Sequence, residues 1–187
     1  MLPTALVPIR IGPTAKRRLA HVLSPGERIR LVRELFSHVV SVIGQAGLRT
    51  IALASGRLDA PEGIEVWRDE ARGLNRAVAA ATQRIGAPLI VVHADLPLLT
   101  TDDIDRVLAS PDEVVVARAH DGGTNGLLMR QLIAPAFGRA SALAHAARAR
   151  QAGLRVRVID SPGFALDVDD EPTLSASGVA SVPRTHP

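Results

Sequence analysis

Strand-like and helix-like segments alternate along almost the whole of this 187-residue chain. Short apolar runs such as "LIVV" (89–92) are separated by longer stretches in which apolar residues recur every three or four positions, as in "ERIRLVRELFSHVVSVIG" (27–44). The first pattern is typical of a buried strand and the second of an amphipathic helix. Helices that connect apolar strands form βαβ units, in which a mostly parallel sheet is covered on both faces. The alternation therefore predicts the α/β class, with a single three-layer domain and a mostly parallel, mixed sheet.

The predicted elements follow one another along the chain, and no linker or internal repeat interrupts them. We expect strands at 4–10, 49–55, 64–67, 88–94, 113–119, 126–130 and 154–160, a last extended piece at 164–169, and helices at 27–44, 73–86, 100–110 and 141–153. A length of 187 residues suits one domain with a substantial core. We therefore expect one domain over residues 1–174 and a poorly ordered C-terminal tail over residues 175–187.

The absence of cysteine removes several classes of chemistry. Disulfides, thiolate nucleophiles and cysteine-based zinc sites are excluded, and a reducing compartment is favoured. The sequence has no run of 18 apolar residues, and its N-terminal segment "MLPTALVPIR" lacks the basic and apolar regions of a secretory signal. We therefore expect a cytoplasmic protein that does not act at a membrane.

The charge of the chain is easily misread. The formal net charge is only +3 although the sequence pI is about 10.8, because few groups titrate between neutral pH and the arginines. Aromatic residues make up 2% of the chain, too few for a base-stacking surface, so we expect no nucleic-acid partner. Lys16 is the one lysine among 22 basic residues, which indicates a position that requires an ammonium group rather than a guanidinium.

Acidic residues occur at the end of one predicted strand and within the last predicted extended piece. Asp95 comes directly after the strand at 88–94, and Asp167 and Asp169 lie two positions apart in "LDVDD". In parallel sheets ligands bind beyond the carboxyl ends of the strands, and residues i and i+2 of an extended segment point to the same side. Carboxylates placed in this way are suited to Mg²⁺. Taken singly, Asp95 also fits a turn or a helix cap, and the pair also fits an ordinary turn.

A basic loop follows the first strand. In "RIGPTAKRR" the side chains of Arg10, Lys16 and Arg18 could hold a polyphosphate at the mouth of the sheet, although a solvated charge cluster fits equally well. The loop lacks the spacing of a Walker A loop and of the dinucleotide fingerprint.

Two later motifs offer groups that bind anions. "HDGGTNGLLM" (120–129) has paired glycines that could form an anion nest, with the Thr124 hydroxyl as a further donor, or could form a hairpin loop. Ser141 begins a predicted helix, where it could face an anion or act as a cap. His145 lies one turn further on, where it could contact a phosphate or be an ordinary core or surface histidine.

Taken together, these motifs resemble one family, the guanylyltransferases that activate 2-phospho-L-lactate or phosphoenolpyruvate in the biosynthesis of the deazaflavin coenzyme F-420. The resemblance covers nearly the whole chain in order. It rests on "VPIR" with "AKRRLAHVLSPGER", "GLN" (73–75), "ADLPLL" (94–99), "GGTNGLL" (122–128), "FGRAS" with His145, and "LDVDDEPTL". The Gly-Gly-Thr-Asn block is its most specific part, since Asp-Leu-Pro-Leu occurs in nucleotidyltransferases more widely.

The resemblance implies a fold, a cofactor and two substrates. The fold is similar to that of the GT-A nucleotide-sugar transferases, the cofactor is Mg²⁺, and the substrates are GTP and a phosphorylated small acid. Asp95, Asp167 and Asp169 match the metal ligands, with Asp95 and Lys16 as the catalytic residues. Thr124, Gly138 and Ser141 match the positions that hold the acceptor. Arg10, Lys16 and Arg18 should face the GTP phosphates, and Asn75 the nucleoside.

The implied reaction needs no general base, because a phosphate oxygen with a second pKa of about 6 is already ionised at neutral pH. It attacks the α-phosphorus of GTP and pyrophosphate leaves. The product would pass to a downstream transferase. Rival hypotheses are a nucleotidyltransferase with a 3-phosphoglycerate, molybdopterin or sugar-phosphate acceptor, and a non-catalytic nucleotide-binding protein. This chain departs from the family pattern at Arg10, His93 and Ala140, and in the order of residues 170–173.

Overall fold

The computed structural model describes residues 2–69 and 73–179. Seven strands form one sheet in the order β3-β2-β1-β4-β6-β5-β7. The strands are β1 (Thr4–Arg10), β2 (Thr50–Ser55), β3 (Glu65–Arg68), β4 (Leu89–Val92), β5 (Val114–Arg118), β6 (Thr124–Met129) and β7 (Val156–Ile159). All neighbouring pairs are parallel except the two that involve β6, which runs antiparallel to both β4 and β5. The predicted α/β class and mostly parallel, mixed sheet are confirmed.

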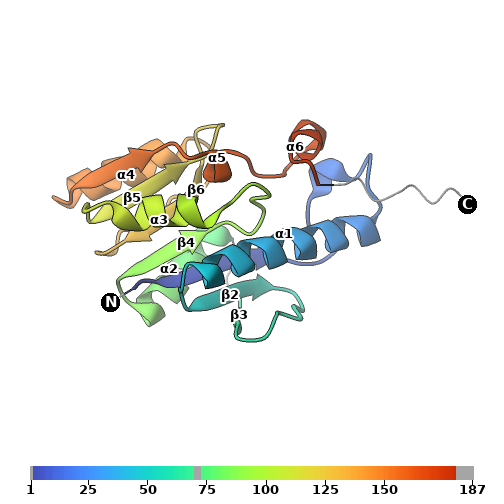
Figure 1. Cartoon of the computed structure of the whole chain (residues 1–187), viewed down its shortest axis with the longest axis horizontal. Coiled ribbons are helices and arrows are strands. Elements are labelled where there is room, and N and C mark those ends of the chain that lie inside the picture. Colours follow the sequence, from blue (N-terminus) through green and yellow to red (C-terminus); the bar gives the residue numbers. More distant parts are fainter. Residues whose placement is uncertain (1, 70–72, 180–187) are drawn as a thin grey trace, which may run out of the picture.

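Helices cover both faces of the sheet, which gives the three layers visible in Figure 1. Helices α1 (Pro25–Gln45), α3 (Thr101–Ala109) and α5 (Pro162–Ala165) share one buried cluster with the sheet, and α2 (Leu74–Ile85) and α4 (Ser141–Gln151) share the other. Helix α1 begins with a capping box: the Ser24 hydroxyl accepts from the Glu27 N–H, and the Glu27 carboxylate accepts from the Ser24 N–H. No helix in the described part of the chain is long and apolar enough to cross a membrane.

A third, smaller buried cluster joins the segment after β1 to the C-terminal part of the described chain. Leu19, from the 3₁₀ turn at Arg17–Leu19, and Val168 pack against Leu31 and Leu35 of α1. Helix α6 (Glu171–Ala176) lies beside the loop that follows β1, at the same end of the molecule (Figure 1). This cluster brings the basic loop and the C-terminal aspartates to one place.

Some segments differ from the sequence prediction. Residues 164–169 are not simply extended, because Pro162 starts the single-turn helix α5, whose Phe164 is buried against the sheet. Strand β6 begins at Thr124, two residues before its predicted start, so Thr124 and Asn125 belong to the strand and not to the loop. Helix α6 continues to Ala176, past the predicted domain end, and residues 180–187 of the predicted tail lie outside the described residues.

Candidate active site

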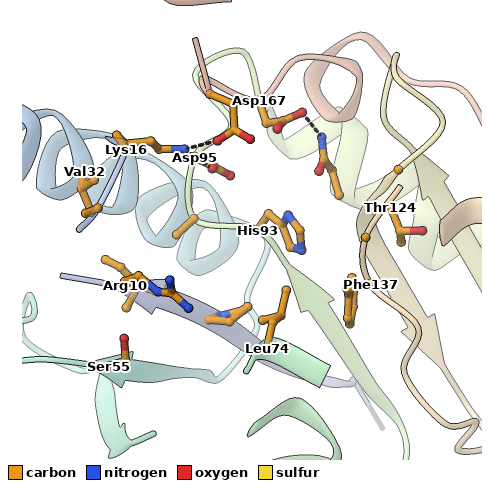
Figure 2. A pocket seen from close by; sticks show the side chains of 18 of the residues that line it. Arg10, Lys16, Val32, Ser55, Leu74, His93, Asp95, Thr124, Phe137 and Asp167 are labelled. Carbon is orange, nitrogen blue, oxygen red and sulfur yellow. Dashed lines mark hydrogen bonds and ion pairs between the residues drawn. The ribbon is translucent and has the colours of Figure 1, made fainter. Parts of the chain in front are cut away.

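A cavity of about 710 Å³ opens beyond the carboxyl ends of β1, β2 and β4. Its walls come from the basic loop after β1, the turn after β4, the start of β6, the 137–141 loop and the 167–169 segment. Figure 2 shows Arg10, Lys16, Asp95, Asp167 and Thr124 around this space. Because β6 runs antiparallel to β4, the beginning of β6 lies beside the carboxyl end of β4.

Three carboxylates gather at one end of the cavity. Asp95, Asp167 and Asp169 each offer one oxygen, and these oxygens lie within 4.8 Å of one another. A main-chain hydrogen bond of 3.1 Å from the Val168 N–H to the Asp95 carbonyl fixes the two segments together. The Asp95 Oδ1 atom is buried and, among the described residues, has no hydrogen-bond partner. A set of hard oxygen ligands with one atom still unpartnered fits a divalent cation such as Mg²⁺.

Lys16 is the cation that this acidic cluster contains. Its ammonium pairs with Asp95 and, at 2.9 Å, with Asp169, and only 9% of its side chain is exposed. Burial by itself lowers the pKa of Lys16, but the charges of Asp95 and Asp169 outweigh burial and raise it above its ordinary value. The residue adopts a left-handed backbone conformation with φ 49°, which aims the side chain back across the loop. The sequence argument that position 16 requires an ammonium has this geometry as its physical basis.

The carboxylates differ in their proton affinity. Burial favours the neutral form of Asp95, but the Lys16 charge prevails and the pKa of Asp95 is lowered. The pKa of Asp167 is raised, first by burial and then by the neighbouring Asp95 and Asp169 charges, against a hydrogen bond from Asn125. A divalent cation bound here would favour the ionised form of all three carboxylates.

Sequence reasoning missed two residues that shape this site. The buried Asn125 amide donates to the Phe164 carbonyl at 2.9 Å and to Asp167 Oδ1 at 3.1 Å, so it orients a predicted metal ligand. The buried Arg28 guanidinium donates to the carbonyls of Pro13, Ala15 and Leu23 at 2.9–3.1 Å, so it holds the loop that carries Lys16. Asn125 could have been found as the neighbour of Thr124 in the Gly-Gly-Thr-Asn block; a lone arginine in a helix gives no such signal.

The predicted acceptor residues meet in another part of the cavity wall. Thr124, Gly138 and Ser141 line it, and the Ser141 hydroxyl donates to Thr124 Oγ1 at 3.1 Å. The N–H groups of Gly122 and Gly123 are bonded to Ala119 O and Asp121 Oδ1, so the paired glycines form the hairpin loop between β5 and β6 and not an open anion nest.

His145 is a core residue behind this part of the cavity wall. Its Nε2 accepts from the Ala136 N–H at 2.8 Å, so the proton resides on Nδ1, which lies 3.0 Å from Thr124 Oγ1. Burial, with smaller effects from Arg148 and His93, lowers its pKa to about 4. The ring is therefore neutral at pH 7 and holds Thr124; it does not line the cavity. Ala140, one of the positions at which this chain departs from the expected family pattern, adopts φ 51°, a conformation that favours glycine.

The remaining predicted residues divide between the cavity and its surroundings. Arg10 and Arg18 line the cavity, and Arg18 lies 3.7 Å from Asp169. The Asn75 amide is bonded through both its nitrogen and its oxygen to the main chain of Phe137, at 2.9 and 2.7 Å. The structure does not bring Asn75 into the cavity wall, so its nucleoside contact stays a prediction.

Comparison with solved structures agrees with this architecture. A nucleotide-diphospho-sugar transferase structure from Desulfovibrio desulfuricans superposes with a TM-score of 0.74 at 15% identity, over 90% of this chain and 84% of that one. A 2-C-methyl-D-erythritol 4-phosphate cytidylyltransferase from Thermus thermophilus gives a TM-score of 0.57 at 18% identity, over 95% and 97% of the two chains. These likenesses show the fold, which is the one expected from the motifs.

Sequence comparison identifies nearer relatives. The phosphoenolpyruvate guanylyltransferase of Sphaerobacter thermophilus is 36% identical over 90% of this chain and 89% of its own length. The 2-phospho-L-lactate guanylyltransferase of Haloarcula marismortui is 36% identical over 88% of this chain and 80% of its own. The family described as "Guanylyl transferase CofC like" matches residues 3–176, which include every strand of the sheet and the clustered Asp95, Asp167 and Asp169. With a match of that extent, the chain belongs to the CofC-like guanylyltransferase family.

Proposed function

We propose that this protein is a Mg²⁺-dependent guanylyltransferase that joins GMP from GTP to a phosphorylated C3 acid and releases pyrophosphate. The observation that carries the proposal is the cluster of Asp95, Asp167 and Asp169 beside the buried Lys16 ammonium, at the mouth of a parallel sheet. The relatives that carry phosphoenolpyruvate and 2-phospho-L-lactate in their names suggest the acceptor class. The family suggests a place in coenzyme F-420 biosynthesis.

Residues of this chain supply most of what the reaction requires. Asp95, Asp167 and Asp169 would hold the Mg²⁺, which when bound neutralises phosphate charge and polarises the α-phosphoryl group. Arg10, Lys16 and Arg18 add positive charge along the wall where the nucleotide phosphates would lie. An acceptor phosphate oxygen forms the new bond to the α-phosphorus, and the bond from this phosphorus to the oxygen that bridges to the β-phosphorus breaks. Catalysis then rests on positioning and electrostatics, without a general base.

The product is a mixed anhydride of two phosphates. Such a compound is an activated donor, so the reaction that consumes it would transfer the acid's phosphoryl unit to an alcohol and release GMP. This chemistry fits the expectation that the product passes to a downstream transferase.

The test is an assay of pyrophosphate release. The protein is incubated with Mg²⁺, each of the four NTPs, and phosphoenolpyruvate, 2-phospho-L-lactate or 3-phosphoglycerate. We expect release with GTP and one of the first two acids, and none when Mg²⁺ is replaced by EDTA. Asp95→Asn should lower turnover by orders of magnitude, while Asp102→Asn, at an exposed position of α3 away from the cavity, should not. No release with any pair of substrates would refute the proposed function.

A further inference from the structure

The His93 imidazole is a polar group of the cavity wall that the proposed metal site does not use. His93 lines the cavity, yet its Nε2 atom is buried and, among the described residues, has no hydrogen-bond partner. A buried nitrogen left without a partner is energetically unfavourable, because it has lost its hydrogen bonds to water. A ligand in the cavity that offers an acceptor to this nitrogen would remove that cost.

The backbone fixes where this side chain points. Along β4 and the turn after it, Ile90, Val92, Ala94 and Leu96 face the cluster under α1, whereas Leu89 and Val91 face the cluster under α2 and α4. The alternation along the strand places the His93 side chain on the same side of the sheet as Leu89 and Val91. Its N–H donates to the Asn125 carbonyl at 3.0 Å, which extends the pairing of β4 with β6 by one residue.

The ring itself is held by an aromatic neighbour. The imidazole packs on Phe137, with ring centroids 5.3 Å apart and an interplanar angle of 39°. Figure 2 shows the ring directed into the cavity, with Phe137 on one side and the aspartates on the other. The side chain is therefore preorganised and not free to seek a partner elsewhere.

His93 lies between the two halves of the site. His93 lies two residues before Asp95 in the chain, and the cavity wall that contains His93 also contains Asp167. On its other side, Phe137 directly precedes Gly138 of the acceptor-binding end. In a 2-phosphorylated C3 acid, the phosphate must likewise lie between the carboxylate and the α-phosphorus that the phosphate attacks.

From this placement we infer that His93 is an acceptor-binding residue, which donates a hydrogen bond from Nε2 to the phosphate group of the phosphorylated acid. The inference rests on the proposed function and adds to it a residue that recognises the phosphate. The role assigned to His93 is binding alone, since the attacking oxygen is already ionised and needs no general base. An acid without a phosphate cannot reach Nε2 and leaves that nitrogen unpartnered, so His93 contributes to discrimination as well as to binding.

Three variants separate the hydrogen bond from the packing of the ring. His93→Phe keeps an aromatic ring on Phe137 and removes the donor, whereas His93→Gln keeps an amide donor close to the position of Nε2. We expect His93→Phe to raise the KM for the phosphorylated acid about 10- to 100-fold, as for loss of a hydrogen bond to a charged group, with the KM for GTP within twofold. His93→Gln should recover most of the loss. His120→Phe, at an exposed position outside the cavity wall, is the matched control.

A direct binding measurement is independent of turnover. The ring ¹H–¹⁵N signals of His93, assigned by their absence in His93→Phe, should shift when phosphoenolpyruvate and Mg²⁺ are added to the unmodified protein, and not with pyruvate and Mg²⁺. If the unmodified protein released no pyrophosphate with any acceptor, the proposed function would fail, and these signals would still report whether a phosphorylated acid binds at His93.

The inference on His93 is overturned by any of three results. The KM for the acid is unchanged in His93→Phe, the KM values for acid and GTP rise equally, or the ring signals respond to pyruvate as they do to phosphoenolpyruvate. Should His93→Phe fail to fold, the spectra of the unmodified protein, with His93→Gln for assignment, decide the question alone.

Discussion

Replacement of Lys16 by methionine tests the electrostatics of the site without any assumption about its substrates. The substitution keeps most of the aliphatic length and removes the one ammonium that pairs with Asp95 and Asp169. Without it, three carboxylates remain within 4.8 Å of one another. We therefore expect the metal-free protein to lose stability and to regain much of it when Mg²⁺ occupies the same carboxylates.

The size of the loss follows from the burial of the pair. Removal of one partner from a fully buried ion pair costs roughly 3–5 kcal/mol. Lys16 is 9% exposed and Asp95 23%, but Asp169 is 48% exposed, so solvent screens part of the interaction. A loss of about 2–3 kcal/mol is then reasonable, and for a chain of this length it lowers the Tm by about 5–10 °C.

The assay is thermal unfolding in EDTA and in excess Mg²⁺, for the native protein, Lys16→Met and Arg30→Met. Arg30 is an exposed residue of α1 away from the cavity, so its substitution should leave the Tm nearly unchanged. Mg²⁺ should raise the Tm of Lys16→Met more than that of the native protein. The reasoning is wrong if Lys16→Met unfolds within about 1 °C of the native protein in EDTA, or if Mg²⁺ shifts both proteins equally.

Three further changes probe the surroundings of the site. Asn125→Ala removes the donor that orients Asp167 and should raise the Mg²⁺ concentration for half-maximal activity about 10-fold or more in the pyrophosphate assay; an unchanged value would remove Asn125 from the metal site. The pKa of His145 is about 4 in the folded protein, against an ordinary value of 6.5, so the unfolded chain binds this proton at a higher pH than the folded protein does. The free energy of unfolding should therefore fall by up to about 3 kcal/mol as the pH drops from 6.5 towards 4. Urea titrations should show a shallower fall for His145→Asn, and parallel curves for the two proteins would contradict this. Gly126→Ala places a methyl carbon 2.7 Å from the Phe164 ring and should lower the free energy of unfolding by about 1–3 kcal/mol. Gly44→Ala in α1 has open space around it and should raise the free energy of unfolding by up to about 1 kcal/mol. Calorimetry that finds the same sign for the two variants would refute the packing argument.

The sequence predicts the fold well because the strands that form the sheet carry a strong periodic signal. The runs that became β2, β4 and β5 are almost wholly buried, and buried parallel strands read as continuous apolar segments. The direction of β6 could not be predicted in this way, since an antiparallel strand inside a mixed sheet has the same apolar composition. The predicted start of β6 was also two residues too late, because Thr124 and Asn125 are polar. Both side chains are nevertheless buried, and they are hydrogen-bonded to His145 and Asp167, respectively.

Residues of the candidate site could be predicted where the chemistry requires a particular residue type, but not where a residue's role depends only on the path of the main chain around it. Carboxylates after strands indicate a metal, so Asp95, Asp167 and Asp169 could be proposed before their proximity was known. Arg28 gave no signal, because its three acceptors are main-chain carbonyls that any sequence would supply. Asn75 remains a prediction: its motif suggested a nucleoside contact, and the structure shows its amide bonded to the main chain of Phe137.

The position of the aspartates along the chain has a consequence for how the protein is assembled during synthesis. All strands of the sheet are complete by Ile159, whereas Asp167 and Asp169 follow it, held to α1 through Val168. The strands therefore precede the last two aspartates in the order of synthesis, and the proposed cation, which would need all three carboxylates, could bind only after the 167–169 segment has packed beside Asp95. Binding of the proposed metal would then report that this last segment has joined the fold.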